Sequence, residues 1–183
     1  MSVEAITEVR QYLTFMLDDE MYALDIIRVH SVLDYERVTK VPKTPDFMRG
    51  VINLRGSVVP IVDLKLKFGL GRTEQSIDAC VIIVEVDVDG EATVLGTLSD
   101  SVQEVVDIEP GEIEPPPKIG TRLDTDFIKG MARRGESFII ILDLERIFTL
   151  EELNLVQAVG EQKAEPGDDA PKAAKKKKAE AEA

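Results

Sequence analysis

The chain has 183 residues, of which 44% are apolar and 31% charged, and its formal net charge is −13. This balance predicts a soluble folded protein and excludes a fully disordered one, and every apolar run is shorter than the ~18 residues that span a membrane. Residues 73–116 hold 12 acidic residues and no basic one. Such a surface repels phosphates, so a nucleic-acid partner and direct membrane insertion are not expected.

Most of the chain has the pattern of short strands. Alternating apolar residues predict a hairpin over residues 12–24, with its turn at Asp18–Glu20. Further strands are predicted at 51–54 and 58–62 around Arg55-Gly56, at 80–88 and 92–98 around Asp89-Gly90, and at 138–142.

Helices are predicted to be few and short. Asp63 and Asp143 each follow a strand and precede a short apolar segment, which suits them as helix N-caps. We expect a C-terminal helix over residues 151–159. Residues 160–183 consist mainly of Ala, Lys, Glu, Pro and Gly, which predicts a disordered tail.

The sequence repeats itself. Residues 46–68 match residues 126–148 without gaps at an offset of 80, with eight identities that include Gly50/Gly130 and Asp63/Asp143. A second match, at an offset of 73, relates residues 30–36 to 103–109. Two related units therefore fill about 10–70 and 79–150, each the size of a small β-barrel, and repetition alone predicts a division near residue 75.

No pattern of catalytic or metal-binding residues emerges. His30 and Cys80 are the only histidine and cysteine, so no metal centre of usual spacing and no internal disulfide can form, which fits a reducing cytoplasm. Asp63 and Asp143 are better explained as caps than as a catalytic carboxylate pair. We therefore expect no enzyme activity and no cofactor, and we look for a binding surface. Half-exposed valines at 29, 32 and 38 suit either an interface or a barrel core, and spacing alone does not decide between them.

Residues 50–70, GVINLRGSVVPIVDLKLKFGL, closely resemble the signature of the CheW family of chemotaxis coupling proteins. The flanking segments at 11–29, 38–50, 95–108 and 141–148 agree, so the resemblance covers about 10–150. It implies a single CheW-like domain of two SH3-like five-stranded β-barrels that share a core, with strands near the end of the domain returning to the first barrel. It also implies a cytoplasmic adaptor, associated with membrane receptor arrays. Its partners would be the cytoplasmic tips of methyl-accepting chemotaxis receptors and the regulatory domain of the histidine kinase CheA.

The resemblance also implies site residues. For the receptor these are Val29, Ser31, Val32, Gly50, Arg55, Val102 and Val105, and for the kinase Val38, Thr39 and Val41. Ser31 stands where many family members have an acidic residue, so its polar partner must differ. Two other functions remain open: a structural scaffold of an array outside chemotaxis, and a small-molecule-binding regulatory domain or hydrolase that uses the groove between the barrels.

Overall fold

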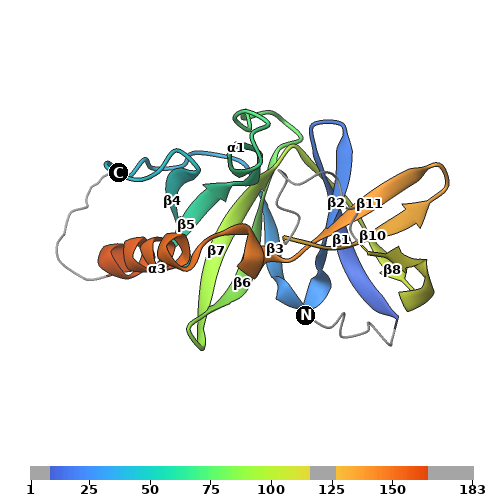
Figure 1. Cartoon of the computed structure of the whole chain (residues 1–183). Helices are drawn as coiled ribbons and strands as arrows, with labels where there is room; N and C mark the ends of the chain where they lie inside the picture. The colour runs from blue at the N-terminus through green and yellow to red at the C-terminus, as the bar shows by residue number, and fades with distance from the viewer. Residues whose placement is uncertain (1–8, 116–126, 165–183) are drawn as a thin grey trace.

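A computed structural model describes residues 9–115 and 127–164 of the protein. Two strongly curled β-sheets lie side by side, with one long helix against the second sheet (Figure 1). The predicted fold class, two small β-barrels that share a core, is confirmed. One sheet has the expected five strands, and the other has a sixth strand of two residues at its edge.

Barrel 1 is the six-stranded sheet, with the order β8-β1-β2-β11-β10-β9. Every neighbouring pair in it is antiparallel except β11 and β2, which run parallel. Its strands are β1 (Arg10–Leu17), β2 (Glu20–Asp25), β8 (Ser101–Ile108), β9 (Ile113–Glu114), β10 (Ile128–Arg134) and β11 (Ser137–Leu142).

Barrel 2 is the five-stranded sheet, with the order β3-β6-β7-β5-β4. The Asp89-Gly90 turn joins β6 and β7 in the long hairpin that the sequence predicted, because both residues adopt positive φ. Its strands are β3 (Val29–Asp34), β4 (Met48–Leu54), β5 (Ser57–Asp63), β6 (Cys80–Val88) and β7 (Glu91–Ser99).

The helices are α1 (Leu64–Lys67), α2 (Leu144–Ile147) and α3 (Leu150–Ala164), with 3-10 turns η1 (Ile26–Arg28) and η2 (Pro110–Glu112). As predicted, the carboxylates of Asp63 and Asp143 cap α1 and α2 by accepting the amides of Lys65 and Glu145. Helix α3 is longer than the expected 151–159 and takes in the first residues of the expected tail. Its apolar side packs on barrel 2 through Leu153, Val156 and Val159, and residues 165–183 lie outside the described residues.

The two repeat units exchange strands. The β1–β2 hairpin of the first unit pairs with β8 and β11 of the second, and the β6–β7 hairpin of the second pairs with β3 and β5 of the first. A division of the chain near residue 75 would therefore cut through both barrels. The two units fold as one body because each barrel needs strands from both.

The largest apolar cluster lies between the barrels. It contains side chains from both, such as Phe15 and Ile82, together with Leu144 and Val156 of the helices. Four phenylalanines that recur in the repeat, Phe47/Phe127 and Phe68/Phe148, form two ring pairs there. The ring centroids of Phe47 and Phe148 lie 5.4 Å apart, and those of Phe68 and Phe127 lie 4.8 Å apart. Each fully buried side chain of this size stabilises the fold by about 1.5–3 kcal/mol, so the barrels are held together mainly by this shared core.

Two lysines of α1 reinforce the junction. Lys65 Nζ lies 2.7 Å from an Asp18 carboxylate oxygen in barrel 1 and 3.2 Å from one of Asp100. Burial alone would lower the pKa of Lys65, but the hydrogen bonds to these carboxylates outweigh it and raise the pKa. Lys67 lies 2.6 Å from both carboxylate oxygens of Glu152 on α3. The α1 helix is therefore tied by charge both to barrel 1 and to α3.

Candidate functional site

The predicted receptor-binding valines lie on two edge strands, β3 of barrel 2 and β8 of barrel 1. Cys80 of β6 pairs with Asp34 of β3, and its thiol donates to the Asp78 carbonyl at 3.4 Å. Burial, with the nearby Asp34 carboxylate, raises the pKa of the Cys80 thiol, which favours its neutral form.

All four valines lie on the faces of their sheets that border the shared core, and Val29 and Val102 pack half-buried against it. Val29 and Val32 lie opposite Val84 and Ile82, and Val102 and Val105 lie opposite Phe15 and Leu13; all four partners belong to the cluster between the barrels. Directly paired residues share a face of a sheet. Val32 and Val105 nevertheless remain 39% and 47% exposed. We call Val29, Val32, Val102 and Val105 the valine margin, because they border the shared core, two from each barrel.

Ser31 does not join the valine margin. A bulge at His30 shifts the register of β3, so Ser31 pairs with Ile83, whose side chain lies inside barrel 2. Ser31 lines a hollow of about 770 Å³ between barrel 2 and α3, together with Arg55 of the β4–β5 turn and Gln157 of α3. The His30 ring lies 3.0 Å from a Glu85 carboxylate oxygen, which holds the bulge against β6. The structure thus groups Ser31 with Arg55, apart from the valines.

Gly50 lies with the predicted kinase segment instead. Thr39 and Val51 exchange two backbone hydrogen bonds of 2.9 and 2.8 Å, which fasten the segment before β4 to the edge of that strand. A Cβ at Gly50 would stand 2.0 Å from the Thr39 carbonyl oxygen, and φ is +141°. Glycine is required here by the close approach of two backbones.

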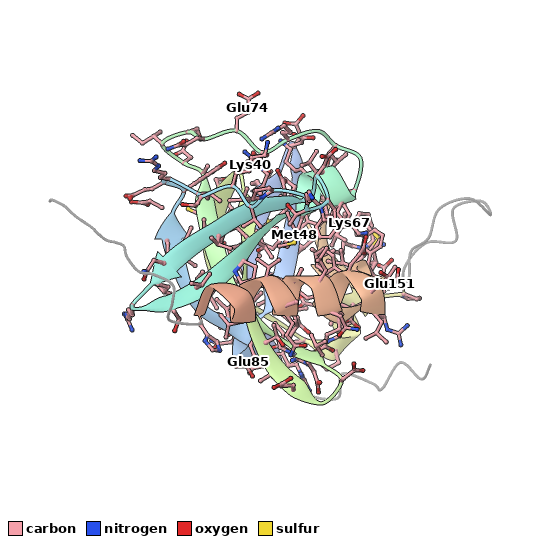
Figure 2. The ribbon with its side chains drawn as sticks, turned by 90° about the vertical axis from the view of Figure 1, so that its left-hand side faces the viewer. Lys40, Met48, Lys67, Glu74, Glu85 and Glu151 are labelled. Carbon is pink, nitrogen blue, oxygen red and sulfur yellow. The ribbon has the colours of Figure 1, made fainter. Side chains whose placement is uncertain are left out.

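The predicted kinase residues differ in exposure. Val38 packs half-buried against the interior of barrel 2, and Val41 packs half-buried against the shared core, whereas Thr39 between them is exposed. The two valines therefore anchor the segment, whereas Thr39 and the neighbouring Lys40 are exposed to solvent. Figure 2 shows Lys40 above helix α3.

Comparison with known proteins decides the family. The family model described as the CheW-like domain matches residues 11–152. The chain belongs to this family. It is 34% identical to the chemotaxis protein CheW of Klebsiella aerogenes over 82% of this chain and 88% of the relative. It is 31% identical to the chemotaxis protein CheW of Treponema pallidum, over 78% of this chain and 84% of the relative. A solved structure, the scaffolding protein TtCheW from Thermoanaerobacter tengcongensis, is similar with a TM-score of 0.68 and 40% identity, over 78% of this chain and 90% of that one.

A buried polar network that was not predicted from the sequence is centred on Asp63. The Asp63 carboxylate is fully buried and accepts hydrogen bonds from Thr73 and from Arg49, whose guanidinium lies 2.7 Å away. Arg49 also donates to the Thr73 carbonyl and the Tyr35 hydroxyl. The network fixes the connectors on either side of the β4–β5 hairpin. The recurrence of a basic residue at 49 and 129, with Asp63 and Asp143, is the signal that could have revealed it.

The described part of the chain contains no group of three or more His, Cys, Asp or Glu side chains placed to hold a metal ion. None of the helices among the described residues is long and apolar enough to cross a membrane.

Proposed function

We propose that this chain is a non-enzymatic adaptor that couples methyl-accepting chemotaxis receptors to the histidine kinase CheA, in the cytoplasm at receptor arrays. The observation that carries the proposal is the valine margin: four valines from two barrels, partly exposed along a single shared core. Family membership and relatives named as chemotaxis and scaffolding proteins support it.

The valine margin is the proposed receptor surface. Exposed β-branched side chains beside an open strand edge suit the apolar stripe of a helical hairpin. Val32 and Val105 come from different barrels, so one bound hairpin would contact both. Ser31 and Arg55, which lie around the hollow at barrel 2, form a second, polar contact, in which Arg55 offers a planar fork for carboxylates. Gly50 contributes only indirectly, because it lets the backbone of the 38–41 segment lie close to β4.

The kinase surface is the segment of Val38, Thr39 and Val41. Its backbone is fixed by the Thr39–Val51 hydrogen bonds and its two valines are anchored, so a partner meets a pre-ordered surface and little ordering entropy is lost. This segment and the valine margin lie on one rigid body joined by the shared core. Movement of a bound receptor can bias the kinase only if the contacts differ in free energy between the kinase states. Weak single contacts suffice in an array because of the high effective concentration.

Two separate binding measurements test this assignment. The double variant Val32→Glu/Val105→Glu should weaken binding of a receptor-tip fragment more than tenfold, because two charges enter an apolar contact. Its affinity for the kinase regulatory domain should stay unchanged. Leu150→Glu is the matched control, since Leu150 is 55% exposed at the start of α3 and lies outside both surfaces. Unchanged receptor binding by the double variant would refute the receptor surface, and no binding of the kinase domain by the wild type would refute the adaptor role.

A further inference from the structure

A pocket on barrel 2 is lined by cations that form no ion pair with any described residue, and we propose that it binds a small, free phosphate compound. The ligand class is a phosphate monoester, held by its phosphate group. A site for such a ligand is separate from the contacts with receptor and kinase, so this inference goes beyond the proposed function.

Two connectors form the walls of the pocket, which has a volume of about 270 Å³. Residues 35–47 join β3 to β4, and residues 68–79 join α1 to β6. The Tyr35 amide donates to the Ala79 carbonyl at 3.0 Å, which ties the start of the first connector to the end of the second. The walls are therefore fixed before a ligand arrives, and little ordering entropy is lost on binding.

The buried side of the pocket has hydrogen-bond donors that no described residue uses. Tyr35 is only 8% exposed, and its hydroxyl accepts a hydrogen bond of 2.8 Å from Arg49. The proton of that hydroxyl has no acceptor among the described residues. Arg49 uses its Nη1 group to bind Asp63 and the Thr73 carbonyl, and its Nε–H group makes no hydrogen bond in the described part of the chain. A buried donor without an acceptor is unfavourable, so these groups fit a ligand that supplies acceptor oxygens.

The exposed side of the pocket carries an excess of positive charge. Glu36 is the single acidic residue among the described ones that line it, and Arg49 is neutralised by Asp63 at 2.7 Å. Glu74, which Figure 2 shows at the same end of the molecule as Lys40, does not line the pocket. Three further cations line it, come from both connectors and form no ion pair with any described residue. These cations are Arg37, Lys40 and Arg72. Against the single carboxylate they leave two positive charges without a counter-charge.

This charge and these donors fit a phosphate monoester. Such a group carries about −1.5 to −2 charges at pH 7, which balances the excess, and its oxygens are strong acceptors for the unused donors. Guanidinium groups bind phosphate through two parallel hydrogen bonds. A single carboxylate would leave part of the charge uncompensated. A membrane lipid is disfavoured as the source of the phosphate, because a net charge of −13 repels an anionic surface.

Titration calorimetry of the chain with glycerol phosphate tests the proposal. At neutral pH and about 20 mM salt, the wild type should bind one equivalent with a dissociation constant below about 1 mM. Arg37→Gln/Arg72→Gln removes one guanidinium from each connector and should weaken binding by about tenfold or more. The matched control is Lys129→Gln/Arg134→Gln, which makes the same change in net charge at exposed positions of β10 in barrel 1. The control should bind like the wild type.

Tyr35→Phe separates a built site from a general attraction of charge. It removes the hydroxyl without changing the charge, and it should weaken binding about fivefold. Thermal unfolding midpoints show whether each variant is folded, and the arginine variant with its control decides the outcome if Tyr35→Phe does not fold.

Three results would overturn the proposal: a wild type that does not bind glycerol phosphate, equal weakening in the arginine variant and its control, or a folded Tyr35→Phe variant that binds like the wild type. Vesicles that contain phosphatidic acid should leave the chain in the supernatant on sedimentation, and co-sedimentation would overturn the assignment to a free ligand. These measurements use neither receptor nor kinase, so their failure leaves the adaptor role to its own test.

Discussion

Replacing Gly50 with alanine would drive a methyl group into the backbone of the kinase segment. The new Cβ would lie 2.0 Å from the Thr39 carbonyl oxygen and 2.7 Å from its carbon, at a φ of +141°. The segment must move away, which removes the two Thr39–Val51 hydrogen bonds. These contribute about 1 kcal/mol each, and the backbone strain adds about 1–3 kcal/mol. We expect a loss of about 3–5 kcal/mol in the free energy of unfolding, or roughly 10 °C in Tm.

Two other glycines provide matched controls for this prediction. Gly56 also has positive φ, +86°, but a Cβ there meets nothing within 4 Å, so Gly56→Ala should cost only about 1 kcal/mol of strain. Gly130→Ala would bring its Cβ to 2.5 Å from the Ile113 Cγ2 methyl group and 3.2 Å from the Glu114 carbonyl oxygen, so its loss of stability should lie between those of the other two.

Chemical denaturation measures the three free energies, and titration calorimetry measures binding. Gly50→Ala should weaken the kinase domain's binding and leave receptor-tip binding unchanged. If Gly50→Ala is no more destabilising than Gly56→Ala, the reasoning from backbone contact is refuted.

Three further predictions concern charged side chains. Burial alone would raise the pKa of Glu152, but the hydrogen bonds from Lys67 and Thr149 and the Lys67 charge together outweigh it and lower the pKa. This stabilisation is therefore present above pH 4.5, the ordinary value, and is lost on acidification below it, so a pH series of denaturation curves should show a smaller loss of stability in acid for Glu152→Gln than for the wild type. Arg55→Ala should change stability by less than about 0.5 kcal/mol yet impair receptor-dependent kinase activation, and unchanged coupling would remove Arg55 from the site. Asp63→Asn should cost about 3–5 kcal/mol because Arg49 loses its buried partner, and a loss below about 1 kcal/mol on denaturation would contradict that role.

The hairpins were predictable because their signals are local. Alternating burial and the Asp89-Gly90 turn belong to neighbouring residues, and the repeat showed that two similar units exist. The exchange of the β1–β2 and β6–β7 hairpins between the two units could not be predicted from these patterns. Either hairpin fits either barrel, and the choice depends on contacts between residues about 50 to 100 positions apart. Only the family resemblance indicated it.

The candidate site was predictable in part for a related reason. The valine margin was predictable because its valines lie on strands next to residues of the core. The prediction placed Ser31 on the same surface, but the bulge at His30 turns its side chain to the opposite face of β3. The residue types at 29–31 do not indicate a bulge. Gly50 was assigned to the receptor, yet its close contact is with Thr39, which comes from the pairing of segments distant in the sequence.

If this chain joins a receptor to a kinase through two different surfaces, kinase activation must depend on both of them. Kinase ATP turnover in a reconstituted system of receptor, kinase and this chain measures that dependence. We expect the wild type to activate the kinase only when receptor is present, and Val32→Glu/Val105→Glu to abolish activation while still binding the kinase domain. Full activation by this variant, or activation by the wild type without receptor, would show that the chain does not couple the two.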